Sequence, residues 1–259
     1  MAVYCLALMA MIAVITGASS GIGKATALKL ARQDYEVLAV GRDAEALEAL
    51  CATIRGDGGR GTPLVSDVTA GAAPAAIVAR AAELGGIDAL VNAAGVIASG
   101  GVAETTDEGW DAMLDVNVRA PFRLIREAAS LLAARKGAVV NVSSVAGVRA
   151  FPGLVSYCVS KAAIDQLTRC AALDFAAQGI RVNAVNPGVV VTNLHRRGGM
   201  DPEKYAAFLD KSRTTHPLGR AGTPEEIAEL IAFLVSPASG WITGDTISID
   251  GGRHLTCLR

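Results

Sequence analysis

The sequence predicts an α/β fold, in which a single doubly wound, seven-stranded parallel sheet carries helices on both faces. Three observations predict it. Seven short apolar runs recur along the 259 residues, and each ends in a turn. The runs are apolar on both faces, as strands are in a parallel sheet that is covered on both sides. Helical patterns separate the runs, and this alternation is typical of doubly wound sheets.

Each predicted strand is a short apolar run that stops at a glycine, serine, aspartate or arginine. The runs, in chain order, are MIAVITG from Met11, EVLAVGR from Glu36, GTPLVSDV from Gly61, IDALVNAAG from Ile87, AVVNVSS from Ala138, IRVNAVNPG from Ile180 and TISIDGG from Thr246.

The predicted helices fill the intervals at 22–33, 43–55, 72–84, 107–134, 154–178 and 224–235. Asp43, Thr106 and Thr223 stand where an N-cap is needed. The longest break in the pattern is 189–218, and loops of that length are often active-site lids. Its Gly198–Gly199 pair suggests a mobile hinge. We therefore expect one domain over 11–259, with the lid region at about 189–218, preceded by an apolar extension at 1–10.

The charge balance excludes some classes of function. Lys and Arg number 24 against 25 Asp and Glu, which argues against a nucleic-acid surface or a polybasic membrane patch. A secretory signal would begin with a basic residue, but none precedes Lys24. A membrane span needs about 20 apolar residues, and the first glycine turn comes too early. A cytoplasmic protein is expected, with a membrane-tethering segment as the alternative.

The five cysteines, Cys5, Cys51, Cys158, Cys170 and Cys257, show no CxxC or Cys/His ligand spacing. Reduced thiols in a cytosolic protein are the simplest interpretation, and no metal site is expected.

The stretch TGASSGIG, from Thr16 to Gly23, follows the first predicted strand and leads into the first predicted helix. Glycine lets a backbone turn sharply and admits a ligand where a Cβ would collide. A helix N-terminus then offers free N–H groups to a pyrophosphate. The glycines are spaced G-x-x-x-G-x-G, which differs from the common G-x-G-x-x-G fingerprint. A tight turn without function is therefore the alternative. The strand before and the helix after favour a dinucleotide site in a Rossmann-type sheet.

Four more motifs follow in order: NAAG at 92–95, SSVAG at 143–147, YCVSK at 157–161 and NPG at 186–188. With the glycine turn, they make the chain resemble the short-chain dehydrogenase/reductase family, in its 3-oxoacyl-reductase-like branch. The resemblance runs from about residue 11 to 252, which is nearly the whole chain.

Tyr157 and Lys161 are four residues apart, so a helix places both on one face. An ammonium nearby would lower the pKa of the phenol from its usual value of about 10. A phenol tuned in this way can exchange a proton with a substrate oxygen. The resemblance implies that Ser144 hydrogen-bonds that oxygen, and that Asn117 kinks its helix and holds a water that relays protons to Lys161. Alternatively, Tyr157 and Lys161 are an ordinary pair on a helix face. Ser144 would then be a strand-end cap, and Asn117 a buried packing residue.

The resemblance also implies a set of cofactor contacts. Asp67 would meet the adenine amino group, unless it is a solvated loop carboxylate, and Thr192 would lie near the nicotinamide carboxamide. The full set is Gly17, Ser19, Ser20, Gly21, Ile22, Gly23, Arg42, Asp67, Val68, Asn92, Ala93, Gly95, Tyr157, Lys161, Pro187, Gly188, Val190 and Thr192.

The end of the second strand favours NADP(H) over NAD(H). An acid at this place bonds the ribose 2′-OH in many NAD sites and repels a 2′-phosphate. Here the position is Gly41, and Arg42 follows with a planar fork of donors that suits a phosphate. Asp43 is expected to turn toward the backbone as an N-cap. A solvated Arg42 without a phosphate contact is the alternative.

These residues predict an NADP(H)-dependent oxidoreductase that moves hydride between nicotinamide and a ketone or secondary alcohol, with Tyr157 as acid and base. One alternative is a 3-oxoacyl-thioester reductase, which would need a basic face for an acidic carrier protein. Leu173 and Asp174 stand where such enzymes often carry arginine, although Arg135 and Lys136 remain. The other alternative is a non-enzymatic cofactor-binding scaffold or sensor, and such relatives often lose the Tyr or the Lys.

Two expectations concern partners. The substrate is a small carbonyl or alcohol, whose identity the sequence does not give. The basic lid residues His195, Arg196 and Arg197 either meet an acidic substrate or form a solvated surface. The long apolar helices at 107–134 and 154–178, which the family pairs between subunits, favour a homotetramer.

Overall fold

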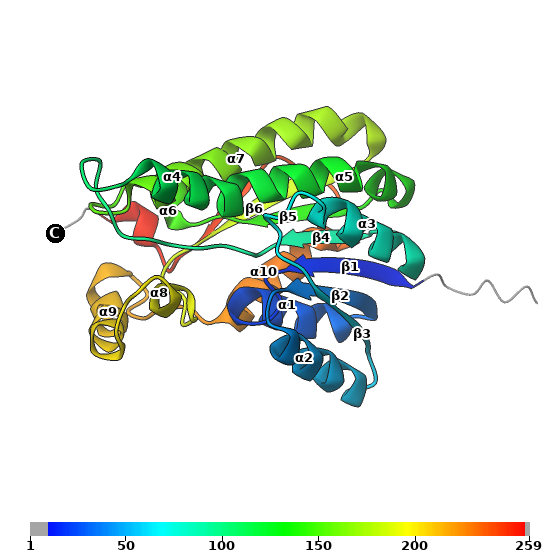
Figure 1. The fold of residues 1–259 in the computed structure, drawn as a ribbon, viewed down its shortest axis with the longest axis horizontal. Coiled ribbons are helices and arrows are strands. Elements are labelled where there is room, and N and C mark those ends of the chain that lie inside the picture. Colours follow the sequence, from blue (N-terminus) through cyan, green and yellow to red (C-terminus); the bar gives the residue numbers. More distant parts are fainter. Residues whose placement is uncertain (1–9, 257–259) are drawn as a thin grey trace, which may run out of the picture.

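The computed structural model describes residues 10–256 and contains a seven-stranded sheet in the order β3-β2-β1-β4-β5-β6-β7 (Figure 1). Every pair of neighbouring strands is parallel. The chain turns back between β1 and β4, which opens a crevice at the carboxyl ends of the strands. The predicted Rossmann-type fold is therefore confirmed. The strands are β1 (Met11–Thr16), β2 (Tyr35–Gly41), β3 (Arg60–Val65), β4 (Ala89–Asn92), β5 (Ala138–Val142), β6 (Arg181–Pro187) and β7 (Thr246–Ile249).

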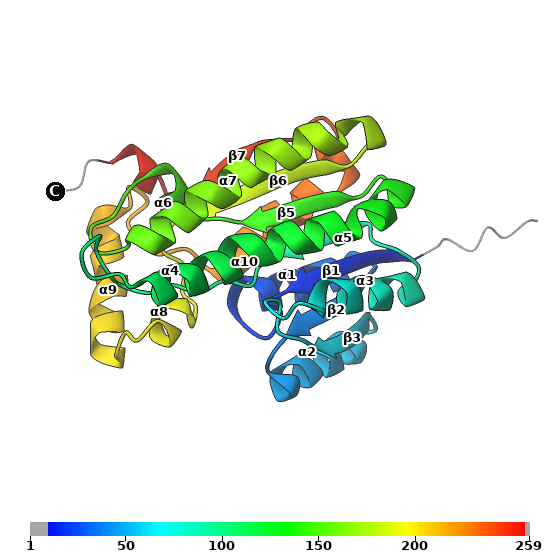
Figure 2. The same cartoon turned by 45° about the horizontal axis from the view of Figure 1, so that its top comes forward.

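Helices cover both faces of the sheet (Figure 2). On one face α1 (Gly21–Ala31), α2 (Ala44–Gly56) and α10 (Pro224–Val235) pack over a core that includes Leu30, Leu47 and Ile231. On the other face α3 (Ala73–Leu84), α5 (Ala120–Arg135) and α7 (Val155–Phe175) pack over a second core. The central strands are buried on both sides, as their unbroken apolar runs predict.

Side-chain caps set the starts of several helices. Asp43 accepts a hydrogen bond from the Ala46 N–H at 3.0 Å, and Thr106 accepts one from the Gly109 N–H. Thr223 and Glu226 form a reciprocal capping box at the start of α10. The three predicted N-caps are confirmed, and α10 has the predicted bounds.

Other helices differ from the prediction. The helix expected at 107–134 is α4 (Asp107–Leu114), a π-helical turn (Asp115–Arg119) and α5. The helix expected at 154–178 is α7 followed by a 3₁₀ turn (Ala176–Gln178). The region 189–218 holds two helices, α8 (Leu194–Arg197) and α9 (Pro202–Thr215). A further short helix, α6 (Val145–Val148), follows β5. Two further 3₁₀ turns span Pro237–Ser239 and Arg253–Leu255.

Strand β3 forms one edge of the sheet and is only partly covered. It carries Pro63 in register with Ala39 of β2. Its first residue, Arg60, forms a salt bridge of 3.2 Å with Glu36 of β2. The strand ends at Val65, earlier than the predicted run, so Asp67 and Val68 lie in the loop that follows.

Most of the predicted N-terminal extension, residues 1–9, lies outside the described residues, as do Cys5 and Cys257. Within 10–256, Cys51, Cys158 and Cys170 are free thiols. In the same part of the chain no helix is long and apolar enough to cross a membrane. The described residues also contain no cluster of ligands that could hold a metal ion.

Candidate active site

A cavity of about 750 Å³ lies at the carboxyl ends of the strands. This volume is in the range of sites that enclose a cofactor or a drug-sized ligand. The wall includes the residues that directly follow five neighbouring strands of the sheet: Gly17 after β1, Arg42 after β2, Ala93 after β4, Ser143 after β5 and Gly188 after β6.

The glycine turn after β1 is closely packed. Gly17 has a φ of 67°, and a Cβ there would lie 2.7 Å from the Ala94 nitrogen. A Cβ on Gly23 would lie 2.4 Å from the Gly17 oxygen. Any larger residue would force the turn to move, so glycine is required at both positions.

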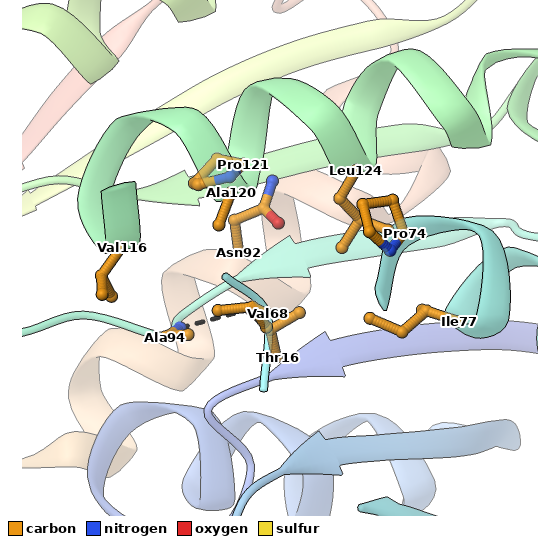
Figure 3. Close-up of a pocket in the computed structure, with 10 residues that line it drawn as sticks. All are labelled: Thr16, Val68, Pro74, Ile77, Asn92, Ala94, Val116, Ala120, Pro121 and Leu124. Carbon is orange, nitrogen blue, oxygen red and sulfur yellow. Dashed lines mark hydrogen bonds between the residues drawn. The ribbon is translucent and has the colours of Figure 1, made fainter. Parts of the chain in front are cut away.

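Thr16 joins the ends of β1 and β4, because its hydroxyl accepts hydrogen bonds from the Ala93 and Ala94 N–H groups at 3.2 Å. It lines a separate cavity of only about 10 Å³ against Asn92 and Val116 (Figure 3). That space is too small for any ligand beyond the size of one water molecule.

The N-terminus of α1 faces the large cavity without a cap of its own. Ser20 occupies the N-cap position, but its side chain makes no capping hydrogen bond. Gly21 and Ile22, in the first turn, line the cavity. Free N–H groups and the positive end of the helix dipole suit a phosphate. Together with the two glycines that leave room for close approach, this part of the cavity fits the pyrophosphate of a dinucleotide.

The end of β2 presents a basic group to the same cavity. Gly41 and Arg42 line it, whereas the carboxylate of Asp43 is engaged as the cap of α2. Asp67, opposite, accepts hydrogen bonds from the Thr69 N–H and hydroxyl at 2.9 and 2.8 Å. These bonds, and to a lesser degree the charge of Arg42, lower the pKa of Asp67. Arg42 could therefore hold an anionic group of a dinucleotide at this end of the cavity.

Tyr157, in the first turns of α7, lines the cavity and is only 6% exposed. Burial raises the pKa of its phenol to about 12, while a hydrogen bond with Ser144 acts in the opposite direction. The direction is opposite to the expected lowering of the pKa, because desolvation outweighs the hydrogen bond with Ser144. A phenol that stays protonated suits the donation of a proton to a carbonyl oxygen.

Lys161 follows one turn later, and its Nζ lies 5.7 Å from the centre of the Tyr157 ring. Its ammonium donates a hydrogen bond of 2.8 Å to the Val142 oxygen at the end of β5. Burial lowers the pKa of Lys161 to about 8, and the carboxylate of Asp165 opposes this shift. The predicted pair therefore lies on one helix face beside Ser144.

Asn117 lies in the π-helical turn and is 2% exposed. Its Oδ1 accepts from the Val96 N–H and its Nδ2 donates to the Val96 oxygen, both at 3.0 Å. Nδ2 also donates to the Ser160 hydroxyl at 3.0 Å. A Cβ added at Gly95 would lie 3.4 Å from Asn117 Oδ1 and 3.8 Å from Lys161 Nζ, so both groups flank one point.

The structure brings nearly all the predicted site residues together. Asn92 and Asn117 do not line the large cavity. The Asn92 side chain donates to Asn141 Oδ1 at 2.9 Å between β4 and β5, which is a contact within the sheet. The predicted residues that do line the cavity are Gly17, Ser19, Ser20, Gly21, Ile22, Gly23, Arg42, Asp67, Val68, Ala93, Gly95, Ser144, Tyr157, Lys161, Pro187, Gly188, Val190 and Thr192.

Comparisons with known proteins agree with this geometry. A family model described as enoyl-(acyl carrier protein) reductase matches residues 17–254. A 3-oxoacyl-[acyl-carrier-protein] reductase from Thermotoga maritima is 37% identical over 243 residues, covering 93% of this chain and 96% of its own. A short-chain dehydrogenase/reductase structure from Caenorhabditis elegans, solved with cofactor, is 36% identical, with a TM-score of 0.89 and coverage of 95% and 96%. The chain belongs to the short-chain dehydrogenase/reductase family.

As a short-chain dehydrogenase/reductase, the protein is an oxidoreductase of CH–OH and C=O groups, in a family that uses nicotinamide cofactors. A related structure from Beutenbergia cavernae contains NADP at low occupancy. It is 32% identical, with a TM-score of 0.86 and coverage of 96% and 98%. The uncapped start of α1 and the glycine turn fit such a dinucleotide.

In this short-chain dehydrogenase/reductase, side chains join parts of the region 189–218 to one another, and one of them reaches the glycine turn. Tyr205 of α9 donates to the Thr192 oxygen at 2.8 Å and accepts from the Thr192 N–H at 3.2 Å. Arg197 of α8 donates to the Ser20 hydroxyl at 3.1 Å. Arg196 lies over the Tyr205 ring, 5.3 Å from its centre. Arg196 and Arg197 are exposed, as a solvated surface would be, and His195 and Arg197 also line the large cavity, so both alternatives for these basic residues stand.

Sequence reasoning missed several residues of the site. Ser160, the fourth residue of the YCVSK motif, connects Asn117 to the Tyr157 carbonyl, to which it donates at 2.8 Å. Asp165 accepts from Asn186 at 2.9 Å and lies near Lys161. Its place four residues after Lys161 is a signal that helical spacing offered. Arg253, close to the C-terminus, also lines the cavity, and no local pattern pointed to it.

Proposed function

We propose that this protein is an NADP(H)-dependent oxidoreductase of a ketone or secondary alcohol, with Tyr157 as the acid and base. One observation carries the proposal: a single cavity joins the glycine turn and Arg42 at one end to Ser144, Tyr157 and Lys161 at the other. A dinucleotide laid across the strand ends would bring its reactive ring to Tyr157.

The cofactor, when bound, supplies or accepts the hydride. Ser144 and Tyr157 would hold the substrate oxygen, and in reduction Tyr157 donates its proton to that oxygen. Lys161 and Asn117, which flank one point beside Gly95, would support the return of a proton to Tyr157. Tyr157 is only 6% exposed, so a cofactor and substrate that fill the cavity would leave little room for water at the phenol.

The proposed activity is tested by a screen of carbonyl and alcohol substrates, in which the absorbance of the reduced nicotinamide is followed. We expect turnover of ketones or secondary alcohols with NADPH or NADP, at higher catalytic efficiency than with NADH or NAD. If no carbonyl or alcohol of any class is turned over with either cofactor, the proposal fails.

The pH profile gives an independent prediction. The pKa of Lys161 is lowered to about 8, so its amine is charged below that pH and neutral above it. The pKa of Tyr157, at about 12, leaves the phenol protonated throughout. We expect kcat/KM for ketone reduction to fall as the pH rises through about 8, since this ratio reports groups of the free enzyme. In Asp165→Asn the midpoint should move to lower pH, because the carboxylate that raises the pKa of Lys161 is lost. A profile that stays flat from pH 7 to 10 contradicts the role of the ammonium.

Reduction of an acyl thioester held on a carrier protein is the second candidate, which the likeness to the Thermotoga maritima enzyme favours. Such a carrier is acidic and needs a basic docking face. On α7 the exposed positions include Leu173, which is 81% exposed, followed by Asp174. Direct comparison of a free 3-oxoacyl thioester with the same acyl group on a carrier protein separates the two. A large gain in kcat/KM on the carrier would favour this candidate.

We also propose a homotetramer of cytoplasmic subunits, each a single catalytic domain over 11–259 with the lid at about 189–218. Apolar side chains remain exposed on the helices that the sequence singled out, among them Phe122 on α5 and Leu173 on α7. Burial of these faces against other copies would remove apolar surface from water. We expect sedimentation at micromolar concentration to give the mass of a tetramer, about four times 26.5 kDa. A monomer under these conditions contradicts the proposal.

A further inference from the structure

The substrate end of the large cavity contains an arginine that the proposed reaction does not use. Arg253 lies in the 3₁₀ turn Arg253–Leu255 and lines the same cavity as Tyr157. Its guanidinium lies over the ring of Phe151, 5.1 Å from the centre, and Phe151 is also part of the wall. An aromatic face holds the guanidinium plane and leaves its edge, which carries the N–H donors, available.

The other cationic groups of the wall already have a partner or a task. Arg42 is at the cofactor end, near Asp67. Lys161 donates to Val142, and the lid residue Lys204 pairs with Asp201 at 3.0 Å.

Within the part of the chain that the structure describes, Arg253 lacks such a partner and lies outside the part of the cavity assigned to the cofactor phosphates. Among residues 10–256 its guanidinium has no hydrogen-bond acceptor and no carboxylate within salt-bridge distance. It contacts the ring of Phe151, and the charges of Arg149 and Asp250 act on it from farther away.

The backbone that carries Arg253 is fixed. Its carbonyl accepts hydrogen bonds from Arg149 Nη1 at 2.6 Å and from the Thr256 hydroxyl at 2.9 Å. Its N–H donates to the Asp250 oxygen at 3.1 Å. The side chain therefore extends from a turn held on both sides, which is what a group that recognises a ligand by geometry needs.

The charges around Arg253 favour an anion. Burial and the neighbouring charge of Arg149 both lower the pKa of Arg253, and Asp250 acts against them. The carboxylate of Asp250 is occupied, because it accepts from the Gly252 N–H at 3.0 Å and from the His254 N–H at 2.7 Å and lies 3.0 Å from His254 Nδ1. Two guanidinium groups thus lie close together, with one carboxylate that is already bonded elsewhere.

We propose that Arg253 binds a carboxylate of the substrate, so that the substrate is an oxo acid or the corresponding hydroxy acid. This inference rests on the proposed reaction at Tyr157. A carboxylate accepts two parallel N–H bonds from a guanidinium edge. The wall around it is largely apolar, with Ile97, Phe151, Leu154, Met200 and Phe208. An apolar stem would therefore join the carbonyl at Tyr157 to the carboxylate at Arg253.

The test uses methyl ketones that end in a carboxylate, with stems of two to six methylene groups, and the primary amide of each. Reduction by NADPH gives kcat/KM for both members of each pair. We expect the wild type to prefer the carboxylate at the best stem length by about ten- to hundredfold, as one charge-assisted pair of hydrogen bonds supplies. Arg253→Met should bring this ratio toward one, and Arg253→Lys should retain part of it, since the charge remains and the fork is lost.

Lys204→Met is the matched control, because it removes a cavity cation that already has a partner; its carboxylate-to-amide ratio should equal that of the wild type. If the wild type reduces acid and amide equally, or if Arg253→Met keeps the full preference, the inference is overturned while the proposed reaction stands. If neither these ketones nor neutral ones are reduced, the proposed reaction itself fails. Circular dichroism of each variant checks that the fold is intact.

Discussion

Tyr157→Phe should lose turnover by about a hundred- to ten-thousandfold, the contribution that a positioned general acid makes. The ring of phenylalanine still packs in the buried site, so only the proton donor is removed. The affinity for NADPH should change little, because the cradle for the phosphates lies at the glycine turn and Arg42. Steady-state kinetics gives the turnover, and fluorescence titration of NADPH gives the affinity.

Tyr35→Phe is the matched control for the loss of a buried hydroxyl. Tyr35 begins β2, is buried and does not line the cavity. We expect this variant to keep the turnover of the wild type. Turnover of Tyr157→Phe within tenfold of the wild type, with the control unchanged, would show that the phenol does not carry the proton.

The second large effect is expected from Gly41→Asp/Arg42→Leu, which should change the preferred cofactor from NADP(H) to NAD(H). The new carboxylate would repel a 2′-phosphate and accept a hydrogen bond from a ribose 2′-OH. The loss of Arg42 removes hydrogen bonds to a charged group, about 1.5–3 kcal/mol or roughly ten- to hundredfold in binding. A Cβ at residue 41 has its nearest neighbours at 3.6 Å, Leu47 Cδ2 and Ser19 Oγ, which is ordinary van der Waals contact.

The measurement is the ratio of kcat/KM for NADPH to that for NADH. We expect the ratio to exceed one in the wild type and to fall by a hundredfold or more in the double variant. Asp43→Asn is a useful control, since it keeps the cap of α2 and removes the other nearby charge; its ratio should remain above one. A wild type that prefers NADH, or a double variant with an unchanged ratio, would assign the choice of cofactor to other residues.

The fold was predictable because its signals are local. Unbroken apolar runs mark strands that are buried on both faces, and α10 has its predicted bounds because Thr223 and Pro224 signal a helix start. The lid was predicted as a break in the pattern, and its helix α9 was not predicted. Asp201 caps α9 and Pro202 follows, which are signals of the same kind, but the helix is largely polar and shows little periodicity.

The remaining features depend on contacts between distant parts of the chain. In the π-helical turn within the predicted helix 107–134, Asn117 hydrogen-bonds with Val96 and Ser160. Hydrophobic periodicity does not indicate hydrogen bonds of this kind. The direction of the Tyr157 pKa shift differs from the expected one for a related reason. Spacing shows that Lys161 is near, but the burial that raises the pKa comes from packing of the whole domain. Arg253 reaches the cavity only because the chain end folds back beside Arg149.

The two edges of the sheet differ in their tendency to recruit another strand. An exposed edge offers a row of unpaired N–H and C=O groups, on which misfolded or foreign chains can polymerise. At the β3 edge, Pro63 removes one donor from that row and Arg60 adds a charge, which are two common protections against amyloid-like growth. The opposite edge, β7, has neither a proline nor a charged residue in Thr246–Ile249. Aggregation during folding should therefore begin at β7, and a lysine introduced there should reduce it.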